Sequence, residues 1–382
     1  MIEKVRLGEL CRIQGGYAFK SNQFQKNNIP IIRIGNIQEN KVLIDNDICY
    51  TKEFLNSHPE FEIKNGDLLI AMSGATVGKV GIYSSKESAL LNQRVGKFVI
   101  TDKIESRYLY FLLLSPLFEK FILNNAFGCA QPNISNKQIE EFKFNKYSIE
   151  TQIEIANKLD KVQEIIDLRK KQTEELDELI KSQFVEIFGD PIENPKNNKI
   201  VKLSDIAEYW NGLTYKPTDV NKEGTIVLRS SNIQNSRLDY EDVVRVDCDI
   251  KEKLYVKDND ILMCSRNGSS RLVGKVAVIK DTLERMTFGA FMMIIRSEYY
   301  PYLFSYFQTD AFRNQIKSGA TTTINQITGN MLNKIKLPLP DMKDIEKFTE
   351  FVKQVDKQKF LIEKSLKETK DLQESLMNKY FL

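Results

Sequence analysis

The chain has 382 residues, of which 42% are hydrophobic and 28% charged, a composition typical of a soluble globular protein with more than one domain. No apolar run approaches the roughly 20 residues of a membrane-spanning helix, and the first residues lack an apolar signal region, so we expect a cytoplasmic protein without a membrane span. The formal charge of +3 permits nucleic-acid binding only if basic side chains are locally clustered.

An internal repeat runs through the chain and predicts two similar domains. Four segments of the first half recur in the same order in the second half. The pairs are residues 5–10 and 201–206, 30–38 and 225–234, 65–83 and 259–279, and 108–122 and 302–316. This alignment places Arg33 opposite Arg229 and Lys79 opposite Lys275.

Short apolar runs inside both halves predict buried strands, at residues 68–72, 98–100, 261–264 and 291–295. Residues 108–122 and 302–316 instead have aromatic and aliphatic side chains at helical spacing. The pattern predicts two α+β domains of mixed strands and helices, in which loops between strands carry the function.

A heptad pattern follows each domain and predicts two long helices. Because each helix has an apolar stripe, the two stripes most simply bury each other as an antiparallel coiled coil, which gives the chain pseudo-two-fold symmetry. The predicted division is domain 1 at 1–147, helix at 148–190, domain 2 at 191–340 and helix at 341–382. The seam residues are Ile155, Leu159, Val162, Ile166, Leu176, Ile180, Phe348, Val352, Val355, Ile362, Leu366 and Leu376.

Two fragments resemble catalytic motifs but depart from them. SGATVGKV, residues 73–80, is one residue short of the phosphate-binding spacing, and Val80 replaces the Ser or Thr that would hold magnesium. PDMK, residues 340–343, is better explained as the start of the second long helix. The lone histidine, His58, is expected on the surface, and five widely separated cysteines are expected to be buried and unpaired. We therefore expect no catalytic residue, metal or cofactor.

Polar loops in both halves form the candidate DNA-binding surface. Arg can pair with guanine and Asn or Gln with adenine, while hydroxyls and lysines suit phosphate oxygens. Ordinary turns use the same residue types, and Asn36 and Asn232 have the alternative role of capping backbone turns. The candidates are Arg33, Asn36, Gln38, Ser73, Lys79, Gln131, Asn133, Arg229, Ser230, Asn232, Gln234, Arg266, Asn267, Arg271, Lys275, Asn325 and Gln326.

Over essentially its whole length the chain resembles the specificity subunit of type I restriction-modification systems. The resemblance is carried by the duplicated IIRIGNIQ and VLRSSNIQ segments, the two VGKV segments, and KLD (158–160) and QVD (354–356) in the helices. It implies two target recognition domains, each of which recognises one half of a split site in double-stranded DNA. It also implies that the helices set the spacing and dock two adenine N6-methyltransferase subunits, which motor-nuclease subunits join.

The second half departs from the first in its last polar loop, where GATTTINQIT (319–328) replaces GCAQPNIS (128–135). The two half-sites should therefore differ. The near-neutral charge predicts that the isolated chain binds DNA weakly. Two alternatives remain at this point: a coiled-coil scaffold whose repeated domains bind proteins, and a single-chain enzyme with an unrecognised site.

Overall fold

The computed structural model describes residues 3–38, 40–126, 132–280, 282, 284–317 and 325–382. The chain forms two compact units, one of Met1–Lys171 with Glu363–Leu382 and the other of Gln172–Ile362. Each unit contains one of the predicted repeats together with parts of both long helices. In the described part of the chain, none of the helices has the length and hydropathy needed to cross a membrane.

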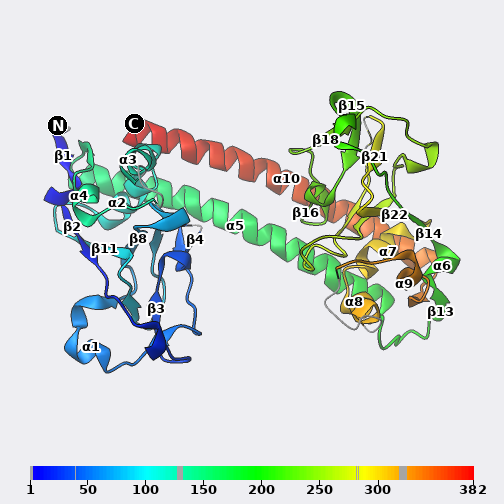
Figure 1. Cartoon of the computed structure of the whole chain (residues 1–382), viewed down its shortest axis with the longest axis horizontal. Coiled ribbons are helices and arrows are strands. Elements are labelled where there is room, and N and C mark those ends of the chain that lie inside the picture. The colour runs from blue at the N-terminus through cyan, green and yellow to red at the C-terminus, as the bar shows by residue number, and fades with distance from the viewer. Residues whose placement is uncertain (1–2, 39, 127–131, 281, 283, 318–324) are drawn as a thin grey trace. The chain divides into compact units, whose positions relative to one another are not determined.

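The heptad patterns form two continuous helices, α5 (Ile149–Phe188) and α10 (Met342–Phe381), each of 40 residues. The first unit holds the start of α5 and the end of α10, and the second unit holds the end of α5 and the start of α10. The helices therefore pair in antiparallel fashion, as predicted (Figure 1). Because α10 begins directly after Asp341, the PDMK fragment is a helix start.

The predicted seam is buried or half-buried at every position. At one end, Ile155 and Leu159 of α5 pack with Met377 and Phe381 of α10 in the core of the first unit. At the other end, Phe184 and Phe188 pack with Phe348 in the core of the second unit. The same apolar stripe therefore holds the helices together and completes the core of each domain.

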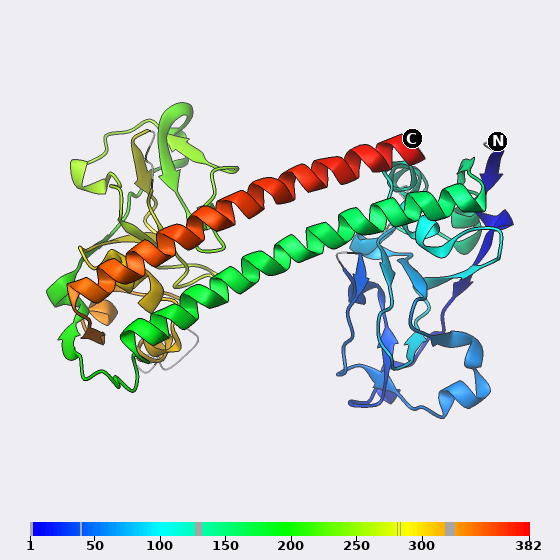
Figure 2. The same cartoon turned by 180° about the vertical axis from the view of Figure 1, so that it is seen from behind.

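The described residues of the first unit form three sheets beside the helices. The six-stranded sheet has the order β2-β11-β8-β9-β5-β4 and the four-stranded sheet the order β6-β3-β10-β7, while β1 pairs with β12. In Figures 1 and 2, α2, α3 and α4 lie toward α5, and α1 lies at the far end of the domain. The bounds are β1 Glu3–Arg6, β2 Cys11–Gly15, β3 Ile29–Ile32, β4 Ile37–Gln38, β5 Lys41–Val42, β6 Cys49–Tyr50, α1 Phe54–Ser57, β7 Glu62–Ile63, β8 Leu68–Ala71, β9 Val80–Ile82, β10 Ala89–Leu91, β11 Val95–Ile100, α2 Ser106–Leu113, α3 Pro116–Ala126, α4 Asn136–Glu140 and β12 Lys143–Lys146.

The second unit repeats this plan with smaller sheets. Its strand orders are β14-β22-β19-β20, β18-β15-β21, β16-β17 and β13-β23. The bounds are β13 Lys199–Lys202, α6 Leu203–Ile206, β14 Glu208–Asn211, β15 Val220–Leu228, β16 Ile233–Gln234, β17 Arg237–Leu238, β18 Val244–Val246, β19 Ile261–Cys264, β20 Val276–Val278, β21 Met286–Phe288, β22 Met292–Arg296, α7 Tyr300–Tyr306, α8 Asp310–Lys317, α9 Gly329–Leu332 and β23 Lys336–Leu339.

Two of the four predicted strand segments, 98–100 and 261–264, are confirmed in full, whereas the prediction of 68–72 was wrong at its last residue, because β8 ends at Ala71. The central strands β8 and β19 are buried on both faces, and β11 contains the predicted run at residues 98–100. The fourth prediction was wrong at its first residue. Phe291 lies in the turn before β22, and 59% of its surface is exposed.

Gly16 and Gly212 occupy equivalent places after β2 and β14, where the backbone passes close to the end of another strand. A Cβ atom on Gly16 would lie 2.2 Å from the carbonyl oxygen of Asn92, and one on Gly212 would lie 2.1 Å from that of Phe288. These distances leave no room for any side chain. Both domains therefore need glycine at this crossing.

Candidate nucleic-acid interface

In the first domain, three polar segments meet at the end of the central strand β8. The Met72 amide donates to the carbonyl of Arg94 (2.9 Å), and the Ile134 amide donates to the carbonyl of Met72 (2.9 Å). Ser73 and Asn133 form an isolated β-bridge. We name the described residues of segments 72–79, 92–94 and 132–137 the first strand-end cluster.

The second domain repeats these contacts at the end of β19. The Ser265 amide donates to the carbonyl of Phe291 (2.9 Å), and the Ile327 amide donates to the carbonyl of Ser265 (2.7 Å). Arg266 and Gln326 form the bridge that corresponds to Ser73 and Asn133. Segments 265–275, 289–291 and 325–330 form the second strand-end cluster. In each domain, backbone hydrogen bonds therefore join two of the three predicted polar loops. These are the loop after the central strand, β8 or β19, and the last polar loop of the domain.

The remaining predicted loop adjoins each cluster. In the first domain, the 3-10 turn Ile34–Asn36 contacts the 3-10 turn Gly74–Thr76. In the second domain, the side-chain amide of Asn267 donates to the Ser230 hydroxyl (3.1 Å). The three loops that the sequence singled out thus lie beside one another within each domain.

Asn36 and Asn232 hold the backbone of these turns and face inward. Asn36 is 9% exposed and Asn232 is 1% exposed. Each side-chain oxygen accepts the amide hydrogen of the arginine three residues earlier (2.9 Å), and each side-chain nitrogen donates to backbone carbonyls. Because these amides are occupied, we correct the prediction and remove both residues from the DNA-binding candidates; the alternative role in turn capping accounts for them.

The arginines of these turns remain candidates. The Nε atoms of Arg33 and Arg229 are both buried and donate no hydrogen bond within the described residues, while both side chains are only half-buried. Arg229 also pairs with the exposed carboxylate of Asp242 (3.0 Å). Gln38 and Gln234 are exposed, and each donates one hydrogen bond to a carbonyl of its own turn, at 2.7 and 3.0 Å.

The strand-end clusters carry cations that have no carboxylate partner among the residues that the structure describes. Lys79, Arg94 and Lys137 are exposed in the first cluster; Arg266 and Arg271 are exposed and Lys275 is half-buried in the second. Among the described residues, none of these side chains forms an ion pair. Unpaired cations next to amide and hydroxyl groups suit a polyanion that also presents hydrogen-bonding edges.

An open pocket of about 410 Å³ lies in the first cluster. It is lined by Met72, Gln93, Arg94, Asn133, Ile134, Ser135, Asn136 and Lys137. Four of these residues were not predicted from the sequence: Gln93, Arg94, Asn136 and Lys137. The repeated sequence segments do not include these residues, and the correspondence of Arg94 with Phe291, a large change of side-chain type, follows from the equivalent backbone hydrogen bonds of the two domains. Gln131, a predicted candidate of the same loop, lies outside the described residues.

The fragment at residues 73–80 does not form a nucleotide-binding loop. After the turn Gly74–Thr76 the chain continues into strand β9, whereas a phosphate-binding loop leads into a helix whose N-terminus faces the phosphate.

The lone histidine is partly exposed, which agrees with its expected place at the surface, but its ring packs against a neighbour. The His58 ring is half-buried and stacks on Phe54, with ring centroids 4.4 Å apart and an interplanar angle of 4°.

The cysteines that can be compared are free thiols, as predicted. Cys11, Cys49 and Cys264 are buried, but Cys248 is half-buried, contrary to expectation. Cys129 lies outside the described residues. Burial raises the pKa of the Cys11 thiol to about 12, so this group carries almost no thiolate near neutral pH.

A model of the family described as type I restriction modification DNA specificity domain matches residues 2–178 and 195–370. The MjaVIII specificity subunit of Methanocaldococcus jannaschii is 29% identical over 180 residues, 46% of this chain and 42% of that protein. The EcoBI specificity subunit of Escherichia coli is 24% identical over 313 residues, 73% of this chain and 62% of that protein. The aligned parts thus span less than two thirds of both relatives. A putative MjaX specificity subunit of M. jannaschii is 25% identical over 94% of this chain and 89% of its own length.

Solved structures share the fold. The crystal structure of a type I restriction-modification S subunit from M. genitalium matches with a TM-score of 0.58 at 14% identity, over 100% of this chain and 96% of that one. A chain from a study of complex assembly in the type I system matches with the same TM-score at 16% identity, over 99% and 97%. Since the family model matches both repeats and most of the chain, the chain belongs to the type I restriction-modification DNA specificity family.

Proposed function

We propose that this chain recognises a bipartite site in double-stranded DNA, one half with each domain. The observation that supports this most is the duplicated strand-end cluster, in which cations that form no ion pair within the described ranges lie beside amides, on a backbone with equivalent hydrogen bonds in both domains. Cations contribute affinity for phosphates and amides contribute discrimination between bases. We carry forward Arg33, Gln38, Ser73, Lys79, Asn133, Arg229, Ser230, Gln234, Arg266, Asn267, Arg271, Lys275, Asn325 and Gln326, and add Gln93, Arg94, Asn136 and Lys137.

We further propose that the helices dock two adenine N6-methyltransferase subunits. Apart from the seam, α5 and α10 expose leucines at matching positions: Leu168 and Leu179 on α5 correspond to Leu361 and Leu372 on α10. The first unit contains Leu168 and Leu372, and the second contains Leu179 and Leu361. Each unit thus presents one leucine from each helix, as two copies of one partner would require.

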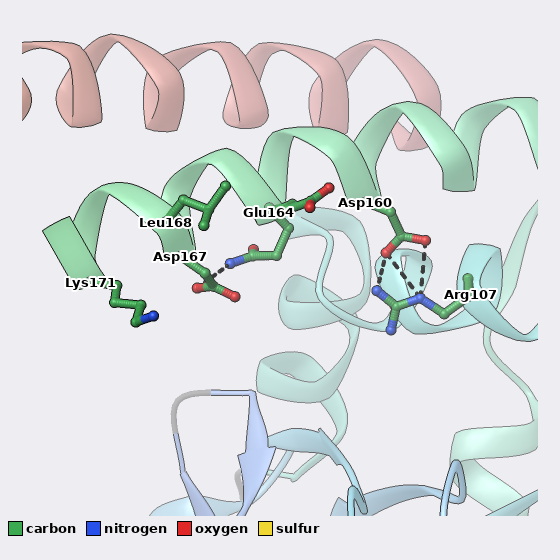
Figure 3. Close-up of a pocket in the computed structure, with 7 residues that line it drawn as sticks. Arg107, Asp160, Glu164, Asp167, Leu168 and Lys171 are labelled. Atoms are coloured by element: carbon green, nitrogen blue, oxygen red, sulfur yellow. Dashed lines mark hydrogen bonds and ion pairs between the residues drawn. The ribbon is translucent and has the colours of Figure 1, made fainter.

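A pocket beside Leu168 supports a docking role for this face of the first unit (Figure 3). It is lined by Arg107, Asp160, Gln163, Glu164, Asp167, Leu168 and Lys171. Arg107 from α2 points at the Asp160 carboxylate on α5, and its Nε donates to the two oxygens at 3.0 and 3.2 Å. This ion pair links the first recognition domain to α5. A methyltransferase subunit that binds α5 would therefore also determine the position of that domain.

The partner subunits would then supply the chemistry. Transfer of a methyl group to adenine, and the ATP-dependent cleavage supplied by motor-nuclease subunits, are assigned to those proteins and not to this chain. The spacing of the two half-sites would follow from the helices. In this scheme residues 1–147 and 191–340 are the two recognition domains, and residues 148–190 and 341–382 are the spacer helices.

A genome-wide map of N6-methyladenine tests the proposal. Cells that express this chain with its neighbouring methyltransferase are compared with cells that lack only this chain. We expect methylation at one split motif, with two unlike half-sites around a fixed gap, to disappear without the chain. An unchanged map with an active methyltransferase would contradict the proposal and favour the scaffold alternative.

A further inference from the structure

A phenylalanine ring is exposed in the middle of the second strand-end cluster. Phe291 ends the turn between β21 and β22, and 59% of its surface is accessible. A single exposed apolar side chain is ordinary on a protein surface. This ring, however, lies among the polar and cationic side chains that we assign to DNA.

The backbone that carries the ring is held firmly. The carbonyl oxygen of Phe291 accepts hydrogen bonds from the Ser265 amide (2.9 Å), the Ser265 hydroxyl (2.9 Å) and the Arg266 amide (3.0 Å). In addition, the Arg266 guanidinium carbon lies 5.4 Å from the ring centroid, within the range of a cation–π contact. The turn therefore presents the ring outward in a fixed place.

The neighbours of the ring suit the major groove of DNA. Arg266 and Gln326 face each other across a β-bridge next to Phe291, and both are exposed. In the major groove, arginine pairs with guanine, glutamine pairs with adenine, and an apolar side chain contacts the 5-methyl group of thymine. The cluster combines all three kinds of group.

The equivalent residue of the first domain has the opposite character. Arg94 occupies the same place, because its carbonyl accepts the Met72 amide just as that of Phe291 accepts the Ser265 amide. Arg94 is exposed and lies beside Gln93 in the polar pocket. One position of the shared scaffold thus carries a hydrogen-bond donor in one domain and a phenyl ring in the other.

We propose that Phe291 is a specificity-determining residue of the second domain, which contacts the 5-methyl group of a thymine in the second half-site. Arg94 serves the corresponding position of the first half-site by hydrogen bonding. The inference rests on the proposed function, because it assumes that each domain recognises one half-site.

The test removes the methyl group and the ring separately. The chain is assembled with its methyltransferase, and binding is measured by competition with duplexes of the methylated motif. In these duplexes each thymine of the second half-site is replaced in turn by deoxyuridine. We expect the wild-type complex to lose about three- to five-fold in affinity at one position, the range expected for burial of one methyl group.

The Phe291→Ala complex should bind thymine and deoxyuridine equally at that position, and should keep its preference in the first half-site. Retained preference at the other base pairs of the second half-site shows that the second domain of the variant is folded. Phe291→Arg, which introduces the residue type of the first domain, should move the preference at that position from thymine toward guanine. Ile192→Ala removes another exposed apolar side chain of the same unit and should keep full sensitivity to deoxyuridine.

Two results would overturn the inference alone: indifference of the wild-type complex to deoxyuridine throughout the second half-site, or unchanged sensitivity in Phe291→Ala. In both cases the complex would still prefer its motif to a scrambled duplex. Loss of that preference in the wild-type complex would instead overturn the proposed function, and this inference with it.

Discussion

Lys359 of α10 forms an ion pair with Asp177 of α5 in the helix seam of the second unit. The lysine is 4% exposed, whereas the aspartate side chain is 52% exposed. By the repeat, Lys359 corresponds to Ile166, a buried apolar seam residue of α5. The seam therefore holds a charged residue where the first helix has a hydrophobic one, and a single exposed carboxylate compensates it.

Two variants of this pair should differ in their effect on stability. Asp177→Asn leaves a buried ammonium group without its counter-charge, so the free energy of unfolding should fall by about 1–3 kcal/mol. Lys359→Ile should leave stability unchanged or raise it, because an apolar residue replaces a buried charge. Thermal unfolding of both variants checks this. A fall in the unfolding temperature for Lys359→Ile would mean that the ion pair contributes net stability.

Gly212 should tolerate no side chain. In Gly212→Ala the new methyl group would overlap the carbonyl oxygen of Phe288, and separating the two strands should lower the free energy of unfolding by about 1–3 kcal/mol. Gly268→Ala is the matched control, since a Cβ there meets nothing within 4 Å. Thermal unfolding compares the two variants. Equal unfolding temperatures would show that the end of β14 can shift at little cost.

Asn232 should matter for stability and not for base recognition. Asn232→Ala removes one acceptor and two donor contacts of a buried amide, so we expect a loss of about 1–3 kcal/mol in the free energy of unfolding. Gln234→Ala, two residues away and exposed, should change it by less than about 0.5 kcal/mol. Unfolding curves and the methylated motif of each variant would be compared. A changed motif with unchanged stability in Asn232→Ala would restore the base-contact interpretation.

These residues also show which features the sequence predicts and which it does not. The helices α5 and α10 follow from a heptad period that is local in the chain, and buried strands such as β8 follow from short apolar runs. The orientation of single loop side chains does not follow in this way. Asn36 and Gln38 are two residues apart in one polar segment, yet one is buried and the other exposed. Arg94 was not predicted, and Phe291 was wrongly placed in a buried strand, because contacts with distant segments set their turns.

The exposed leucines give a test of the docking proposal. Leu168→Glu and Leu361→Glu together should weaken association with the methyltransferase subunits at least about ten-fold, because each places a charge in an apolar contact. Both side chains are more than half exposed, so thermal stability should stay within about 0.5 kcal/mol of wild type. Sedimentation of mixtures checks the stoichiometry. Each single variant should lose one of two partner subunits, and unaffected assembly in the double variant would place docking elsewhere.

Arg94 and Lys137 should play different parts in the first half-site. Both line the same pocket and are exposed. Arg94→Ala should relax the preference for one base pair, with a loss of about five- to one-hundred-fold for the preferred base. Lys137→Ala should weaken binding to all sequences alike and reduce the slope of log affinity against log salt by about one.

Competition binding at several salt concentrations separates the two roles. It uses the complex with its methyltransferase and duplexes substituted at each base pair of the first half-site. Lys103→Ala changes another exposed cation of the same unit, outside the strand-end cluster, and should leave both the preference and the salt slope unchanged. If Arg94→Ala lowers the salt slope and keeps the base preference, the Arg94 guanidinium contacts phosphate and not a base. Recognition of the first half-site must then depend on the amides of Gln93, Asn133 and Asn136.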